Sequence, residues 1–159
     1  LLIAKFGMGK NPIRTMLLAI IAMGVIGAMF TLREWPILFI AGMWLYMVIV
    51  PLIEAAEQTV IQRVVPFERQ GRVFGFAQMM ESAAAPVTAF LVAPIAEFWV
   101  IPWVRSDVGV QATQSLLGTG DTRGIALVFL ISGLLLAFSG ALAFKTKTYR
   151  TLSAFYTKS

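Results

Sequence analysis

Four apolar stretches of the length that crosses a lipid bilayer take up most of this 159-residue chain. They cover residues 16–31, 35–53, 73–96 and 124–144, and one acidic residue, Glu81, interrupts the third. The hydrocarbon core of a bilayer needs about 20 mostly apolar residues per helix. A soluble domain of this size cannot bury so many, so the sequence predicts an all-α membrane protein with four transmembrane helices.

The composition excludes most enzyme chemistry. Only 13% of the residues are charged, whereas a typical soluble domain carries about 25%. The chain has no cysteine and no histidine, so it lacks cysteine-based redox or zinc sites and the commonest general base. It also lacks a Gly-rich phosphate loop, a catalytic triad and a metal cluster. We therefore expect no enzyme activity, no catalytic residue, no cofactor and no metal.

Basic residues are shared unequally between the two sides of the predicted spans. Ten lie on one side, whereas only Arg33, Arg105 and Arg123 lie on the other. Because basic residues in short loops stay in the cytoplasm, we expect the ten, and both ends of the chain, to be cytoplasmic. This topology accounts for the net charge of +5, so we expect no nucleic-acid partner.

The spans set the expected organisation of the chain. They are predicted at about residues 14–32, 35–60, 72–100 and 123–144, within one transmembrane domain that covers 1–144. The remaining residues, 145–159, form a basic cytoplasmic tail. Two alternatives stay open for this tail: it lies on the inner leaflet, or it is disordered.

Local signals add detail to these helices. Pro36 suits the first turn of the second helix, where a missing N–H costs little. A turn is expected at 118–121, followed by Asp121 or Thr122 as the cap of the last helix. The stretch 24–28 contains two glycines and permits close helix approach.

Glu81 is the most informative polar residue because it lies near the middle of the third span. Small and polar residues at spacings of three and four form one face beside it: Gln78, Ser82, Ala85 and Ala89. A charge at that depth costs several kcal/mol unless it faces protein or water. Glu81 and Gln78 are therefore candidates for proton coupling or substrate binding, and we expect Glu81 to face the protein interior. A neutral glutamate with a purely structural hydrogen bond is the alternative.

Prolines interrupt the same helix. Pro86 and Pro94 each remove a backbone hydrogen bond and crowd the preceding turn. We expect a kink at Pro86, which is either a flexing element of a moving protein or a static bend held by neighbouring helices.

Charged residues gather at the inner ends of the second and third spans. Glu54 and Glu57 lie one turn apart, and Arg69 and Arg72 flank Gly71. Opposite charges so close together predict a gate that locks one conformational state. In this gate Arg72 would contact Glu54, Glu57 or a partner outside the chain. Ordinary hydration of a helix end is the alternative.

Three sequence runs resemble the major facilitator superfamily of transporters. The run QTVIQRVVPFERQGRVFG at 58–75 resembles the connection between its tenth and eleventh helices, most like the drug- and macrolide-efflux branch. The run GTGDTRGIAL at 118–127 resembles the entry to the twelfth helix, and AKFGMGK at 4–10 is similar to the loop after the eighth. The resemblance spans nearly the whole chain.

This resemblance implies a twelve-helix fold in two halves. The chain would be a C-terminal fragment, with the last four helices and an N-terminal helix stub from the eighth. Trp44 and Tyr46 would contact substrate, and the helix with Glu81 would lie between the halves. A complete small protein that lost only its first residues is the alternative to a fragment.

The implied function is that of a secondary active transporter. We expect a proton-coupled antiporter that exports small amphipathic compounds by alternating access in a bacterial-type plasma membrane. Its partners would be the lipid bilayer, the missing N-terminal half of the same transporter and a small-molecule substrate. Two alternatives stay open: a self-contained four-helix exporter that acts as a dimer, and a membrane structural or assembly subunit that transports nothing.

Overall fold

The structure, a computed structural model, describes residues 11–32, 35–118 and 122–157. The expected N-terminal helix stub, Arg33 and Asp121 lie outside these residues. The described part is built from helices: α2 (Pro12–Met29), α3 (Pro36–Val64), α4 (Phe67–Ile95), the π-helical turn η1 (Ala96–Val100), α5 (Ile101–Arg105), α6 (Asp107–Leu117), α7 (Arg123–Ala143) and α8 (Lys147–Thr157).

Four helical segments are long and apolar enough to cross a membrane. They are α2, α3, the continuous run Phe67–Arg105 and α7. The prediction of an all-α chain with four spanning helices is confirmed at this level of length and composition. Two segments run further than expected, because α3 continues to Val64 and the third span continues to Arg105.

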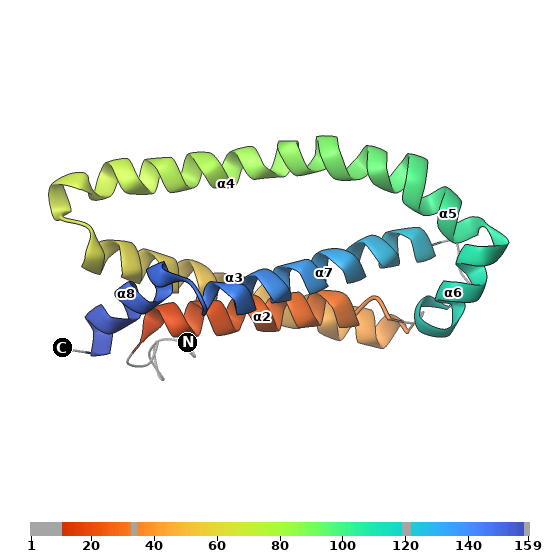
Figure 1. Ribbon diagram of the computed structural model, residues 1–159, viewed down its shortest axis with the longest axis horizontal. Helices are drawn as coiled ribbons and strands as arrows, with labels where there is room; N and C mark the ends of the chain where they lie inside the picture. Colours follow the sequence, from red (N-terminus) through yellow and green to blue (C-terminus); the bar gives the residue numbers. More distant parts are fainter. Residues whose placement is uncertain (1–10, 33–34, 119–121, 158–159) are drawn as a thin grey trace.

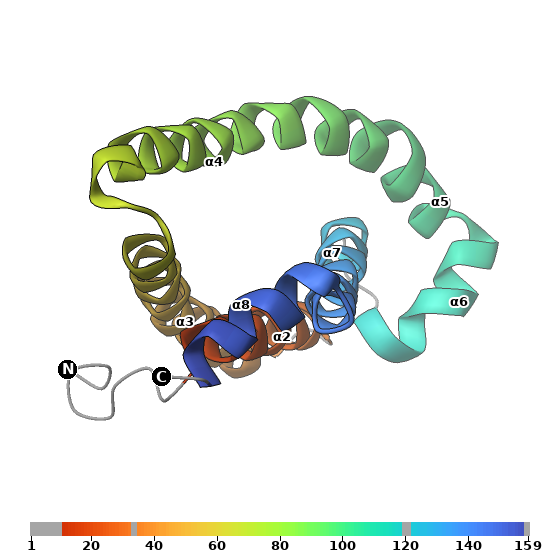
Figure 2. The ribbon, with the colours of Figure 1, turned by 60° about the vertical axis from the view of Figure 1, so that its left-hand side comes forward.

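Three of the spans pack together and the fourth stands apart. The helix α2 contacts both α3 and α7, and we call these three helices the three-helix layer. The helix α4 follows a separate, bowed path in both views (Figures 1 and 2) and contacts α3 and η1 at its two ends. No residue of α4 is buried. The described chain therefore leaves one span without a helical neighbour along most of its length.

Caps and prolines set several helix starts. Asn11 Oδ1 accepts a hydrogen bond of 3.1 Å from the Arg14 N–H, and a proline follows Asn11 in the first turn of α2. Pro36 begins α3, as predicted. Thr122 precedes α7, but its side chain makes no capping hydrogen bond. That predicted cap is wrong because the Thr122 backbone (φ −82°, ψ −1°) is helical, whereas a capping residue needs a non-helical backbone.

The contact between α2 and α7 is a seam of small residues. A Cβ atom added to Gly24 would lie 2.5 Å from the Ala137 nitrogen, and one added to Gly133 would lie 2.5 Å from the Ala28 nitrogen. The two backbones touch at places where no side chain fits, so the close approach predicted from residues 24–28 is confirmed. Such close contacts hold helices together in a membrane. Burying apolar side chains does not drive helix association there, because lipid is as apolar as leucine.

The connection between α4 and α7 contains a helix that the sequence analysis missed. The helix α6 buries Gly109, Thr113 and Leu117, which are spaced by four residues. Ser106 caps α6 by accepting a hydrogen bond of 3.2 Å from the Gly109 N–H. Gly118 ends α6 with a φ of 78°, a left-handed conformation that favours glycine. The Ser106–Asp107 start and the four-residue spacing are the signals that identify such a helix.

The third span stays helical through its prolines. Pro86 and Pro94 lie inside α4, and the π-helical turn η1 follows directly after Ile95. Each proline frees a backbone carbonyl one turn earlier, and π turns occur where such interruptions are accommodated. The outcome is a bowed helix (Figure 1).

The basic residues divide between the two ends of the molecule as predicted. Seven of the nine described ones lie at the end where α2 and α4 begin and where α3 and α7 end. Arg105 and Arg123 lie at the other end. The cytoplasmic location of the more basic end stays a prediction from this distribution.

Candidate functional site

The polar stripe of α4, formed by Gln78, Glu81 and Ser82, has no helix packed against it. All residues from 78 to 91 are exposed. Glu81 is the central residue of α4, since as many residues of the helix precede it as follow it. No described helix covers this face, and the expectation that Glu81 faces the protein interior stays a prediction.

The charged residues of the predicted gate do not pair with one another. Glu54, Glu57, Arg69 and Arg72 are all exposed, and no salt bridge joins them within the described residues. The structure therefore does not bring Arg72 to Glu54 or Glu57, and the predicted gate, with a possible partner outside the chain, stays a prediction. The side chains extend into open space on different turns, and a Cβ atom added to Gly71 would meet no atom within 4 Å.

Gln70 holds the connection between α3 and α4 instead. Its Nε2 donates hydrogen bonds to the carbonyl oxygens of Gln62 and Val65, both at 3.0 Å. Carbonyl groups at the end of a helix lack intrahelical partners, so Gln70 satisfies groups that would otherwise need water. The sequence does not predict this role, because an amide within a charged run has no distinguishing pattern.

The two predicted substrate contacts on α3 lie on different sides of that helix. Trp44 is 66% exposed. Tyr46 is half-buried, its ring centroid lies 6.4 Å from that of Phe30, and it lines a cavity of about 250 Å³ that we call the Tyr46 cavity. The structure does not bring Trp44 and Tyr46 together, nor does it bring either of them to Glu81, which lines neither this cavity nor the larger one.

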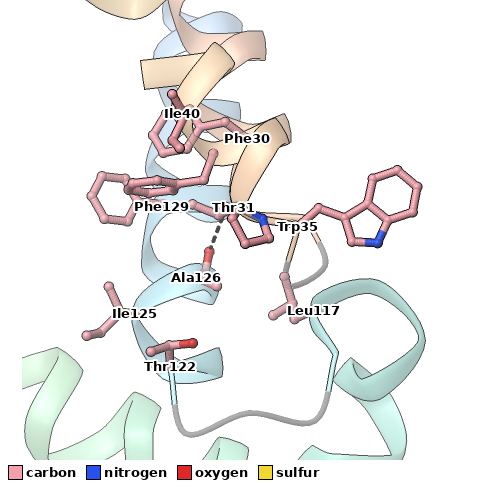
Figure 3. Close-up of a pocket in the computed structure, with 11 residues that line it drawn as sticks. Phe30, Thr31, Trp35, Ile40, Leu117, Thr122, Ile125, Ala126 and Phe129 are labelled. Atoms are coloured by element: carbon pink, nitrogen blue, oxygen red, sulfur yellow. Dashed lines mark hydrogen bonds between the residues drawn. The ribbon is translucent and has the colours of Figure 1, made fainter. Parts of the chain in front are cut away.

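A larger cavity of about 580 Å³, the aromatic cavity, lies where the three-helix layer meets α6 (Figure 3). Its lining is apolar, rich in rings and free of charged residues: Phe30, Thr31, Trp35, Pro36, Phe39, Ile40, Leu117, Thr122, Ile125, Ala126 and Phe129. Thr31 Oγ1 donates to the Ala126 carbonyl oxygen at 3.4 Å. The Thr122 hydroxyl points toward the side of Leu117 (Figure 3). The volume lies in the usual range for small-molecule sites, about 300–1,000 Å³.

Two phenylalanines separate the cavities. Phe30 and Phe129 line both of them, and their ring centroids lie 5.7 Å apart. Phe30 is 3% exposed and also meets Phe39 edge-on at 5.5 Å, whereas Phe129 is 43% exposed. Phe30 is thus the buried side of this wall and Phe129 the exposed side.

The basic tail forms the helix α8 at the opposite end of the three-helix layer. Thr146 Oγ1 accepts a hydrogen bond of 3.2 Å from the Tyr149 N–H at the helix start. The Tyr149 ring packs edge-on against Phe144 with centroids 4.9 Å apart. Asn11 Nδ2 donates a hydrogen bond of 2.6 Å to Ser153 Oγ. Residues 147–157 form a helix docked on the protein, which contradicts a disordered tail there, and a position on the inner leaflet stays a prediction.

Tyr156 completes this docking. Its side chain is buried, and the Arg63 guanidinium lies 5.7 Å from its ring centroid. The Tyr156 hydroxyl has no hydrogen-bond partner among the described residues. Burial raises the pKa of Tyr156 above its ordinary 10.0, and the nearby Arg63 charge opposes that rise.

Tyr156→Phe is expected to keep α8 docked and to stabilise it by about 1 kcal/mol, since it removes a buried, unpartnered hydroxyl. Because the folded pKa of Tyr156 is raised, the stability from this residue is present below pH 10.0 and is lost as pH rises through the folded value. Hydrogen exchange of α8 against pH should therefore show an alkaline loss of protection that is smaller in Tyr156→Phe. Identical pH profiles of the original protein and Tyr156→Phe would contradict the role of Tyr156. The titration of lysines affects both proteins alike and cannot produce a difference between them.

The described residues contain no metal site, and the comparisons with known proteins give no match. Among the described residues, no three His, Cys, Asp or Glu side chains gather in a way that holds a metal ion. No protein-family model matches the chain, and no similar curated protein or solved structure is found. The likeness to the major facilitator superfamily therefore rests on the three sequence runs alone.

Proposed function

We propose that this chain forms part of a secondary active transporter, a proton-coupled exporter of small amphipathic compounds with a major-facilitator arrangement. The observation that carries the proposal is the polar stripe of α4, which lies inside the spanning run Phe67–Arg105 and has no described helix packed against it. A stripe of this kind needs an occupant, and a transport path between two groups of helices supplies one.

Lipid is a poor neighbour for this stripe. A charged glutamate at the centre of a bilayer costs about 2.5–3.5 kcal/mol on insertion scales, and more by other measures. Gln78 and Ser82 add further polar groups on the same face. The three-helix layer cannot cover them, because α4 follows a separate path. Further helices or water must therefore lie beside α4.

The lining of the two cavities supports amphipathic compounds as the substrate class. The aromatic cavity offers rings and two hydroxyl groups but no charge, which suits a compound that is largely apolar with a small polar part. Tyr46 places one more hydroxyl in the adjoining Tyr46 cavity. Together these spaces extend along the three-helix layer, with the Phe30–Phe129 wall between them.

Spin labelling of α4 in the intact protein, in native membranes, tests the proposal. Nitroxides would be attached at Ser82→Cys on the polar stripe and at Val87→Cys on the opposite face. These 159 residues have no native cysteine, and any cysteine elsewhere in the intact protein would first be replaced by serine. Both positions are exposed in the described chain. We expect the label at 87 to be accessible to oxygen, as lipid-facing sites are. The label at 82 should instead be accessible to a water-soluble nickel relaxant, or else to neither nickel nor oxygen.

The same labels separate the alternatives. Equal oxygen accessibility at 82 and 87 would place the stripe in lipid and overturn the proposal. Strong dipolar coupling between labels at 82 in two copies of the protein would favour the self-contained dimeric exporter. A shielded label at 82 in a protein that gives cells no resistance to amphipathic compounds would favour a structural subunit.

A further inference from the structure

The helix α8 acts as a strap across one end of the three-helix layer. Its successive turns contact α7 through the Tyr149 ring, α2 through the hydrogen bond from Asn11 to Ser153, and α3 through Arg63 on Tyr156. Every contact uses the same face of α8, because positions 149, 153 and 156 are spaced by three and four residues. The opposite face is left free.

Exposed basic residues surround this strap. Lys147 lies on the free face of α8 and Arg150 at its flank, whereas Lys145 lies in the turn before α8. Arg14 is exposed in the first turn of α2, one turn beyond Asn11. The sequence has no acidic residue from 1 to 32 or from 124 to 159, so α2, α7 and α8 supply no counter-charge. The acidic residues at this end lie on the other two spans: Glu54, Glu57 and Glu68.

The position of this surface selects its partner. Only three residues separate the end of α7 from the start of α8. The Lys145 and Thr146 N–H groups close a tight turn there by donating hydrogen bonds to the carbonyl oxygens of Leu142 and Ala143. The basic side chains therefore lie within about one helical turn, roughly 5 Å, of the end of a spanning helix. That is the level of lipid headgroups, whose phosphates are the nearest anions to a basic juxtamembrane helix.

We propose that Lys145, Lys147, Arg150 and Arg14 form a binding surface for anionic phospholipid headgroups, which holds α8 across the ends of α7, α2 and α3. The ligand is an acidic lipid of the phosphatidylglycerol type within the bilayer. Bound headgroups neutralise the mutual repulsion of the basic residues, so α8 stays docked. The inference does not depend on the proposed transport function, because it concerns a different end of the molecule from the aromatic cavity.

Hydrogen exchange of residues 147–157 tests this inference. The chain would be placed in nanodiscs of phosphatidylcholine alone and of phosphatidylcholine mixed with phosphatidylglycerol. Each basic residue near an anionic surface contributes about fivefold in affinity, so α8 should exchange more than about tenfold more slowly with phosphatidylglycerol. Raising the salt concentration should reduce the difference, because salt screens exposed charges.

Matched variants identify the residues. The triple variant Lys145→Gln, Lys147→Gln and Arg150→Gln should lose the lipid dependence. The charge-preserving triple Lys145→Arg, Lys147→Arg and Arg150→Lys should keep it. Arg105→Gln, at the opposite end of the molecule, should also keep it. Unchanged exchange of α7 in all three variants would show that the three-helix layer is intact.

Three results would overturn the inference. Equal protection of α8 in the two lipid mixtures would remove the lipid as a partner. Persistence of the lipid effect in the glutamine triple would place the lipid elsewhere. Free glycerol phosphate or an RNA could also be added to phosphatidylcholine nanodiscs. If either one protected α8 as well as phosphatidylglycerol does, a soluble anion would be the occupant of the surface.

Discussion

Replacing Gly24 or Gly133 with alanine is expected to push α2 away from α7 and to destabilise the three-helix layer by about 3 kcal/mol, the upper range of overpacking costs. The new Cβ atom would lie 2.5 Å from the nitrogen of Ala137 or of Ala28. These obstacles are backbone atoms, so no side-chain rotation relieves the clash. Both helices must then shift along the whole seam, which is why one methyl group should have a large effect.

Gly75→Ala is the matched control for this prediction. A Cβ atom added to Gly75, in α4, would meet no atom within 4 Å. Alanine is favoured over glycine in a helix by about 1 kcal/mol, so this variant should be slightly stabilised. Unfolding of the 159-residue chain in mixed micelles, with increasing denaturing detergent, should shift in opposite directions for the two variants. A Gly24→Ala protein as stable as Gly75→Ala would contradict the seam.

The spanning helices could be predicted from the sequence because their signals are local. A run of about 20 apolar residues specifies a membrane helix wherever it packs, and Pro36 acts on its own turn. The helices α6 and α8 were harder to predict from the sequence, since each has only 11 residues. Isolated helices shorter than about 12–15 residues are marginal in water. Their stability comes from distant contacts, such as the bond from Asn11 to Ser153 across 142 positions.

The surroundings of the candidate site could not be predicted for a related reason. The spacing of Gln78, Glu81 and Ser82 correctly placed them on one face, since helical periodicity is a property of the segment itself. What that face meets depends on helices elsewhere, and hydropathy marks both α3 and α4 only as spanning helices. The aromatic cavity combines Phe30 with Phe129, which lie on different helices, and no sequence period connects them.

Changing Glu81 is expected to have the largest effect on activity. Under the proposed transport function, Glu81→Gln in the intact protein should abolish pH-dependent export of amphipathic compounds, because the amide keeps the size and hydrogen bonds of the acid but cannot exchange a proton. The effect should exceed about tenfold, since general acid–base groups commonly contribute about 10²–10⁴-fold. Export from membrane vesicles at several pH values is the measurement. Met80→Leu, the adjacent exposed position, is the control and should retain activity.

Glu81→Leu separates coupling from packing. A glutamate that only satisfies a hydrogen-bonding partner would tolerate Glu81→Gln with normal export. In that case Glu81→Leu would still lower stability by about 1–3 kcal/mol, because the partner is left unsatisfied in an apolar setting. Loss of export in both variants, with stability kept in Glu81→Gln, is the result expected of a coupling residue. Normal stability and export in Glu81→Leu would contradict both roles and place this side chain, exposed in the present structure, at a position where the protein does not use it.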